Sequence, residues 1–165
     1  MFERLHTPEE VYEYKLGATL KMENKVLEIL DDSIEHAQEE KVQAALRAHR
    51  AESEQHVRNI EEVFRLFGWE PDESACPAIE GLEKEAKATV KKTDDALVDG
   101  VILQGCVEVE HHEIGVYENL IINATAMGRD DVVQRLRANI DSEHSALEKV
   151  KTLQAEVASR AKQPA

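Results

Sequence analysis

A short stretch in the second half of the chain carries two glutamates within an otherwise apolar helical pattern. If this stretch is helical, then Val107, Glu110, Ile114 and Tyr117 share one face of the helix. Glu113, three residues after Glu110, lies beside it on that face. A glutamate is almost never fully buried unless it is paired or binds a metal. These two carboxylates therefore predict a functional site inside the protein.

Three other long segments carry acidic residues at the same kind of position. Glu23 and Glu143 each interrupt a stripe of aliphatic residues with heptad spacing. On a further stripe, three consecutive inward positions are expected to be His49, Glu52 and His56. Counted from the expected helix starts, the glutamates of all four segments lie roughly 18–23 Å along their helices. Packed together, the four helices would bring these residues to one level.

Such a set of buried carboxylates needs positive charge beside it. Each unpaired carboxylate would cost several kcal/mol, and a domain has only about 5–15 kcal/mol of net stability. No Lys or Arg interrupts the stripes near the glutamates, whereas histidines do. Inward glutamates with histidines are what a two-metal carboxylate site in a four-helix bundle requires. The candidate ligands are Glu23, His49, Glu52, His56, Glu110, Glu113 and Glu143.

Four long helices are expected to position these residues. Thr7, Pro8 and Glu10 form a capping box with proline at the first helical position, and Gly68 and Gly128 end the second and third long helices. The predicted helices span about 8–36, 40–67, 95–127 and 130–157, followed by a frayed tail over 158–165. A connection over 68–93, with a short charged helix inside it, is long enough to cross the length of the bundle. The predicted fold is all-α, an antiparallel four-helix bundle in a single domain over residues 1–165.

Composition excludes several partners. The formal net charge is −14, so nucleic acid and anionic membrane surfaces are not expected to bind. No apolar run reaches ~18 residues, and the first residues do not resemble a signal peptide, so a cytoplasmic location is expected. Cys76 and Cys106 are far apart without a CxxC motif, and are expected to be buried apolar residues.

Six groups of residues, spread over most of the chain, carry a family resemblance. They are Thr7-Pro8-Glu9-Glu10; Glu23 followed by Lys25; His49-x-x-Glu52-Ser53 with His56; Cys76 followed by Glu80-Gly81-Leu82; Val109-Glu110-His111-x-Glu113-Ile114; and Glu143. Together they resemble the YciE/YciF family of small bacterial stress-associated proteins, within the ferritin-like superfamily. The resemblance implies a ferritin-like bundle with one long crossover, a homodimer, and a site for two iron ions, with manganese as the alternative metal.

The ligand pattern departs from that of ferritin and rubrerythrin, in which Glu-x-x-His occurs on the second and fourth helices. Here the second helix offers His49-x-x-Glu52 and Glu52-x-x-x-His56, and Ala146 stands three residues after Glu143. Glu113 is expected to supply the missing ligand. Which of His49 and His56 points inward is left open.

Other candidate residues have simpler explanations. His111 lies about 100° round the helix from Glu110, so it either supports a ligand or marks the edge of the core. His112 and His144 are expected to be exposed. Tyr117 is expected to be a core aromatic residue, with a redox-active side chain as the alternative.

Two functions fit this sequence best. The first is a non-haem di-iron or manganese protein that reacts with O₂ or peroxide, with ferroxidase or peroxide-scavenging activity. The second is a helical stress or scaffold protein that binds metal weakly or for structure only, which the missing Glu-x-x-His motifs favour. An iron-storage cage is a weaker alternative, because no helix of the kind that ferritin shells use is expected after the fourth long helix.

Overall fold

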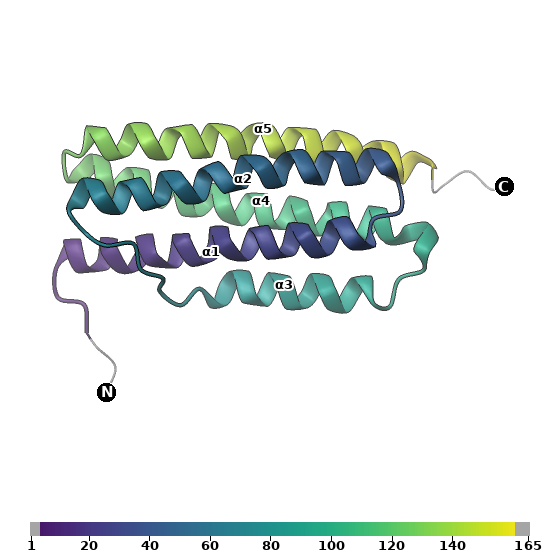
Figure 1. Ribbon diagram of the computed structural model, residues 1–165, viewed down its shortest axis with the longest axis horizontal. Helices are drawn as coiled ribbons and strands as arrows, with labels where there is room; N and C mark the ends of the chain where they lie inside the picture. Colours follow the sequence, from purple (N-terminus) through teal and green to yellow (C-terminus); the bar gives the residue numbers. More distant parts are fainter. Residues whose placement is uncertain (1–3, 161–165) are drawn as a thin grey trace.

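The computed structural model describes residues 4–160, which form five α-helices and contain no strand. The helices are α1 (Pro8–His36), α2 (Glu40–Phe67), α3 (Pro77–Val90), α4 (Asp95–Ala126) and α5 (Asp130–Arg160). The four long helices run side by side, and the short α3 lies along the outside of the bundle next to α1 (Figure 1). The all-α bundle predicted from the sequence is confirmed.

The four long helices alternate in direction around the bundle. Contacts join α1 to α2, α2 to α5, α5 to α4 and α4 to α1, so α1 and α5 are diagonal, as are α2 and α4. The chain leaves α2 at one end of the bundle and enters α4 at the other (Figure 1). The intervening segment therefore crosses the whole bundle, and α3 within it packs on α4 and α1.

Local sequence explains where several helices begin and end. The Thr7 hydroxyl accepts a hydrogen bond from the backbone N–H of Glu10 at 3.1 Å, and the Glu10 carboxylate accepts one from the Thr7 N–H at 3.2 Å. This reciprocal pair is a capping box. Gly68 and Gly128 have φ of 77° and 69° and follow α2 and α4. Only glycine adopts this left-handed conformation without a steric penalty, which explains the two helix ends.

The connection between α1 and α2 has neither glycine nor proline, and a side chain from α4 holds it. Asp99 is 6% exposed, and its two carboxylate oxygens accept hydrogen bonds from the backbone N–H groups of Gln38 at 2.8 Å and Glu39 at 2.9 Å. These N–H groups precede or begin α2, so they have no partner within the helix. The turn is thus fixed by a residue about sixty positions away in the sequence.

The last helix is longer than predicted. It continues to Arg160, so the expected frayed tail is wrong for residues 158–160, while residues 161–165 lie outside the described part of the chain. Val157 packs against the core, and Arg160 donates a hydrogen bond to Glu39 at 2.8 Å. The hydrogen bond to Glu39 at the start of α2 and the packing of Val157 together hold the last residues of α5.

The core is mainly aliphatic, as the low aromatic content implies. At the middle of the bundle, buried polar side chains from all four long helices replace this aliphatic packing. They include Glu23, His49, His56, Glu110, Glu113 and Glu143. Within residues 4–160, no helix combines the length and the apolar character that crossing a membrane requires.

Candidate metal centre

Two groups of potential metal ligands meet at the middle of the bundle. In each group, one ligand atom from every residue lies within 4.8 Å of the others. We call them the His49 position (His49, Glu110, Glu113 and Glu143) and the His56 position (Glu23, His56 and Glu143). Glu143 belongs to both. A carboxylate shared by two neighbouring positions is the arrangement that a pair of bridged metal ions requires.

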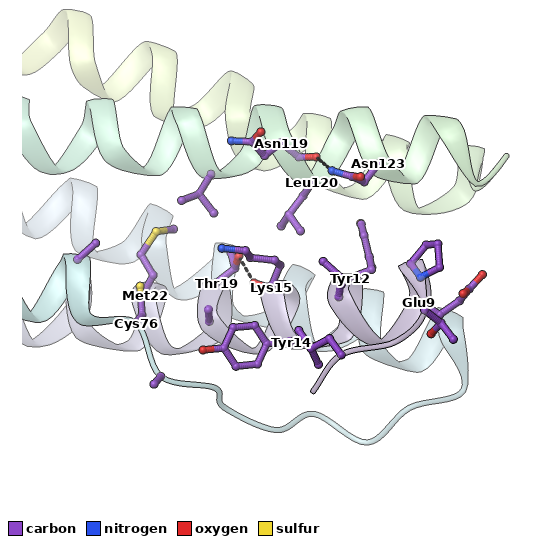
Figure 2. A pocket seen from close by; sticks show the side chains of 18 of the residues that line it. Glu9, Tyr12, Tyr14, Lys15, Thr19, Met22, Cys76, Asn119, Leu120 and Asn123 are labelled. Atoms are coloured by element: carbon purple, nitrogen blue, oxygen red, sulfur yellow. Dashed lines mark hydrogen bonds between the residues drawn. The ribbon is translucent and has the colours of Figure 1, made fainter. Parts of the chain in front are cut away.

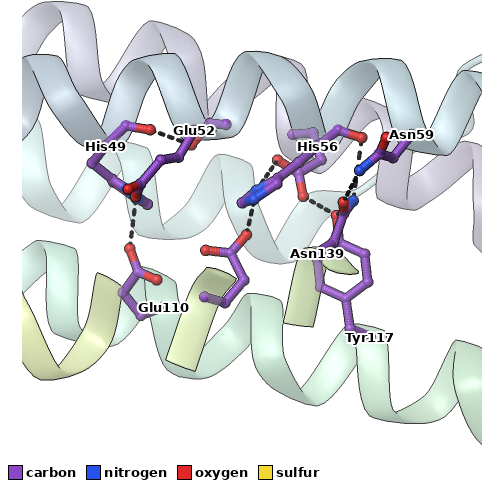
Figure 3. Close-up of polar contacts among 10 residues, drawn as sticks. His49, Glu52, His56, Asn59, Glu110, Tyr117 and Asn139 are labelled. Atoms are coloured by element: carbon purple, nitrogen blue, oxygen red, sulfur yellow. Dashed lines mark hydrogen bonds and ion pairs between the residues drawn. The ribbon is translucent and has the colours of Figure 1, made fainter. Parts of the chain in front are cut away.

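Both histidines of α2 point inward, which answers the question that the sequence left open. His49 Nε2 lies 2.7 Å from Glu110 Oε1 (Figure 3). His56 Nδ1 lies 2.7 Å from Glu143 Oε1 and 3.8 Å from Glu23 Oε2. Seven residues separate the two histidines, which is close to two helical turns, so they share one face of α2. Each position therefore receives one imidazole.

The carboxylates are almost completely removed from solvent. Glu23, Glu113 and Glu143 are 0% exposed and Glu110 is 1% exposed. Both oxygens of Glu113 lack any hydrogen-bond partner. Glu110 and Glu143 each have one oxygen 2.7 Å from a histidine nitrogen, and their carboxylates also lie close to each other and to Glu113. Buried polar atoms are normally satisfied. These unpartnered oxygens thus fit a site that is completed by cations.

Burial changes the protonation of the carboxyl groups. Burial, reinforced by the neighbouring Glu143 carboxylate, raises the pKa of Glu23 to about 8. Burial likewise raises the pKa of Glu110 to about 7, and that of Glu113 well above its ordinary value. A bound divalent cation would favour the ionised form of each group. Metal binding at neutral pH is therefore expected to release protons.

The histidines are shifted by their acidic neighbours. Burial on its own would lower the pKa of His49, but its interactions with Glu110 and Glu52 outweigh burial and raise the pKa to about 10. Burial also opposes the charged form of His56, and the contacts with Glu143 and Glu23 raise its pKa. Without a cation, imidazolium groups would offset part of the carboxylate charge.

Glu52 does not lie where the sequence pattern predicted. The buried stripe of α2 continues from His49 to Ser53 and His56, and the Glu52 side chain is 35% exposed. Its carboxylate accepts a hydrogen bond from Lys149 at 3.0 Å and lies 3.8 Å from His49 Nδ1. The predicted burial of Glu52 beside the other glutamates is thus wrong, and Glu52 belongs to neither position. The helix turns its Ser53 side toward the core, and Ser53 is fully buried there.

The remaining sequence candidates fall outside the two positions. His111 and His144 are exposed, whereas His112 is partly buried, so its expected exposure is wrong. Cys76 and Cys106 are free and buried, as expected of small apolar residues, and burial raises the pKa of Cys106 to about 12. Neither cysteine is part of a ligand group.

Sequence reasoning missed two buried amides beside the His56 position. Asn59 and Asn139 are 6% and 0% exposed, and the Asn59 amide donates a hydrogen bond to Asn139 Oδ1 at 2.6 Å. Asn139 in turn donates to the hydroxyl of Tyr117 at 2.8 Å (Figure 3). Asn139 stands four residues before Glu143 and shares its helical face, and this spacing was the available signal.

A groove lies on the face of the bundle between α1 and α4. Its volume is about 1130 Å³, and Tyr12, Met22, Cys76 and Leu120 are among the residues that line it (Figure 2). Met22 directly precedes Glu23, so the groove lies next to the α1 turn that carries this ligand. The α3 helix packs on α1 and α4 as well, so the groove and α3 share this side of the bundle.

The fold and the ligand groups define a class of protein: a ferritin-like four-helix bundle with an internal cluster of carboxylates and histidines. The chain belongs to the family described as Domain of unknown function (DUF892), which matches residues 7–162. This agrees with the family resemblance noted in the sequence.

Known relatives cover nearly the whole chain. Protein YciF of Escherichia coli (strain K12) is 26% identical over 141 residues, which are 84% of this chain and 85% of YciF. The structure of YcfI from Rhodopseudomonas palustris, described as a proposed structural protein, matches with a TM-score of 0.88 at 32% identity over 92% of this chain and 98% of YcfI. The crystal structure of the E. coli stress protein YciF also gives a TM-score of 0.88, at 23% identity over 96% and 100% of the two chains. This last match supports the shared fold.

Proposed function

We propose that this member of the family of stress protein YciF is a dinuclear metal protein that binds two iron ions, or two manganese ions, between its four long helices. The observation that carries the proposal is the double membership of Glu143, which lies within ligand distance of both histidine positions. The unpartnered oxygens of Glu113 support it independently. Glu23 and His56 would hold one ion, His49, Glu110 and Glu113 the other, and Glu143 would bridge them.

Charge balance favours divalent cations in this pocket. The two positions contain four carboxylates and two imidazoles. If the carboxylates are ionised and the imidazoles neutral, two divalent ions cancel the buried charge. Carboxylate and imidazole ligands suit iron and manganese, whereas soft metals prefer thiolates, which neither position offers. The donor set therefore fits the metals that the family resemblance implies.

With iron, the function that follows is oxidation chemistry on a small oxidant. Two adjacent Fe(II) ions can supply two electrons to one molecule of O₂ or peroxide. The chain's own residues would hold the ions at a fixed spacing and exclude bulk water, since the carboxylates are 0–1% exposed. Ferroxidase or peroxide-scavenging activity under stress is the corresponding biological role.

A second function is favoured by the same burial. A buried group of ligands can hold metal for stability alone, and the relative YcfI is described as a proposed structural protein. In that case the ions would link four helices and raise the free energy of unfolding, without turnover. Redox cycling of the bound metal separates the two functions, because a structural site would bind metal without consuming oxidant.

Metal content and oxidant consumption test the proposal. The chain is expressed with iron or manganese, purified without chelator, and assayed for metal per chain. We expect about two ions per chain in the wild type and fewer in Glu143→Gln, which removes the negative charge of the shared ligand. Glu148→Gln is the matched control, because Glu148 lies on the same helix with a side chain that is 76% exposed. Equal metal content in Glu143→Gln and the wild type would reject the dinuclear site.

Two further expectations remain part of the proposal. A homodimer is expected from the family resemblance, and a cytoplasmic location from the sequence. Light scattering after size exclusion tests the first, since a mass near twice the chain mass of 18.6 kDa is expected. Cell fractionation tests the second.

A further inference from the structure

The hydrogen bonds of Asn139 connect the two residues that would hold the ion of the His56 position. Its amide nitrogen donates to the Tyr117 hydroxyl at 2.8 Å and to the backbone carbonyl of His56 at 3.2 Å (Figure 3). The Tyr117 hydroxyl donates in turn to Glu23 Oε1. One side chain of α5 is therefore linked to Glu23 on α1 and to His56 on α2.

The orientation of this amide is fixed from the opposite side. Asn139 Oδ1 accepts a hydrogen bond from Asn59 at 2.6 Å, and Asn59 Oδ1 accepts one from Gln55 at 2.9 Å. An asparagine amide has two N–H donors and one carbonyl oxygen. Both donors of Asn139 then face the His56 position. With the side chain 0% exposed, water does not compete for these bonds.

This arrangement decides which oxygen of Glu23 is available. A tyrosine hydroxyl has a single proton. Because Tyr117 accepts a hydrogen bond from Asn139, its own proton points to Glu23 Oε1. Glu23 Oε2 has no hydrogen-bond partner and lies 3.8 Å from His56 Nδ1. The network thus orients one free carboxylate oxygen toward the space beside His56.

We propose that Asn139 and Tyr117 are positioning residues that hold Glu23 as a ligand with one available oxygen, and so set the affinity of the His56 position alone. The inference rests on the proposed dinuclear function. None of the hydrogen bonds described above reaches His49, Glu110 or Glu113, and the two positions share only Glu143. Residues that orient metal ligands typically contribute 10–100-fold to metal affinity. Loss of Asn139 or Tyr117 should therefore weaken the binding of only one of the two ions, the one at the His56 position.

The test is a titration of the metal-free protein with Co(II), followed by visible absorption and by calorimetry, neither of which depends on turnover. Tyr117→Phe removes only the hydroxyl, and Asn139→Leu removes the amide with little change of volume. In both variants we expect the first Co(II) to bind as in the wild type, and the second to bind at least about tenfold more weakly. The absorption of the second ion should change, because the geometry at Glu23 changes.

Ser53→Ala is the matched control. The Ser53 hydroxyl is fully buried and donates to the backbone carbonyl of His49 at 3.2 Å, as Asn139 does to that of His56, but it has no link to a carboxylate ligand. We expect Ser53→Ala to leave both binding steps unchanged. Urea unfolding of each metal-free variant measures the loss of stability separately. Should Asn139→Leu not fold, Tyr117→Phe decides the result.

Three outcomes overturn the inference. The first is a second binding step in Tyr117→Phe and Asn139→Leu that equals that of the wild type. The second is equal weakening of both steps, which would indicate a general structural role. The third is weakening by Ser53→Ala of the same size. A wild-type protein that binds no Co(II), iron or manganese would instead reject the proposed function, so the two failures are distinguishable.

Discussion

Glu143 Oε1 on α5 lies 2.7 Å from His56 Nδ1 on α2, and the same glutamate belongs to the ligand group that contains His49. One carboxylate of α5 thus serves both histidines of α2. Its 0% exposure means that no solvent compensates its charge. Metal binding at both positions is therefore expected to depend on this one glutamate.

Replacing Glu113 should separate stability from metal binding. Its two buried oxygens have no partner, so Glu113→Leu should raise the free energy of unfolding of the metal-free protein by about 1–3 kcal/mol. The same change should reduce metal binding, because a ligand is lost. Urea unfolding with and without chelator measures both effects. Glu118→Leu is the exposed control on the same helix, with an expected change within about 0.5 kcal/mol. A loss of metal-free stability in Glu113→Leu would contradict the prediction.

The metal-free protein should become less stable as the pH rises from about 5 to about 8. The pKa values of Glu23 and Glu110 are raised to about 8 and about 7 in the folded state, above the ordinary value of 4.5. A raised folded pKa means that the folded state binds protons more tightly than the unfolded state. The stabilisation that these protons provide is complete below the unfolded pKa and is lost as the pH rises through the folded pKa. The raised pKa values of His49 and His56 act in the same direction.

Bound metal should reverse this trend, since the ions bind the deprotonated ligands. Melting temperatures at several pH values, with chelator and with Mn(II), give the comparison. Glu52 and Asp131, whose pKa values are lowered to about 2, contribute stability that is lost only in stronger acid, so they do not disturb this range. A melting temperature of the metal-free protein that rises or stays level from pH 5 to pH 8 would contradict the prediction that the buried carboxyl groups lower its stability in this range.

Glu52→Ala should keep both metal ions. The Glu52 side chain is 35% exposed and pairs with Lys149 at the surface, an interaction worth about 0–1 kcal/mol. Glu110→Ala, by contrast, removes a ligand of the His49 position and should lower the metal content by at least one ion per chain. Elemental analysis of the two variants, prepared identically, gives the result. Loss of both ions in Glu52→Ala would show that Glu52 is a ligand despite its position.

Asp99→Ala should destabilise the fold without altering the metal centre. It leaves the N–H groups of Gln38 and Glu39 without their carboxylate partner, which should cost about 1–3 kcal/mol. Urea unfolding measures the loss, and metal content per folded chain should stay at the wild-type value. Asp95→Ala, an exposed change in the first turn of the same helix, is the control. Equal stability of the two variants would mean that Asp99 does not hold the α1–α2 connection.

The amino-acid sequence by itself determined the helices and most of the buried polar residues. Heptad spacing, the Thr7 capping box and the glycines at 68 and 128 predict long helices, because these signals act within a few residues. No Lys or Arg lies near the glutamates on these stripes, so the negative charge of the buried carboxylates must be balanced by another group, such as histidine or a metal ion. For this reason the sequence predicted the six residues that the structure places in the two positions.

Tertiary structure alone decided the rest. Glu52 and Ser53 are neighbours about 100° apart on α2, and either continues the spacing from His49 to His56. Packing of α2 between α1 and α5 turns the Ser53 side inward. Contacts between distant helices likewise place Asn139 beside Tyr117 and make Glu143 common to both histidines. No local pattern contains such contacts, because they depend on the rotation of each helix about its own axis.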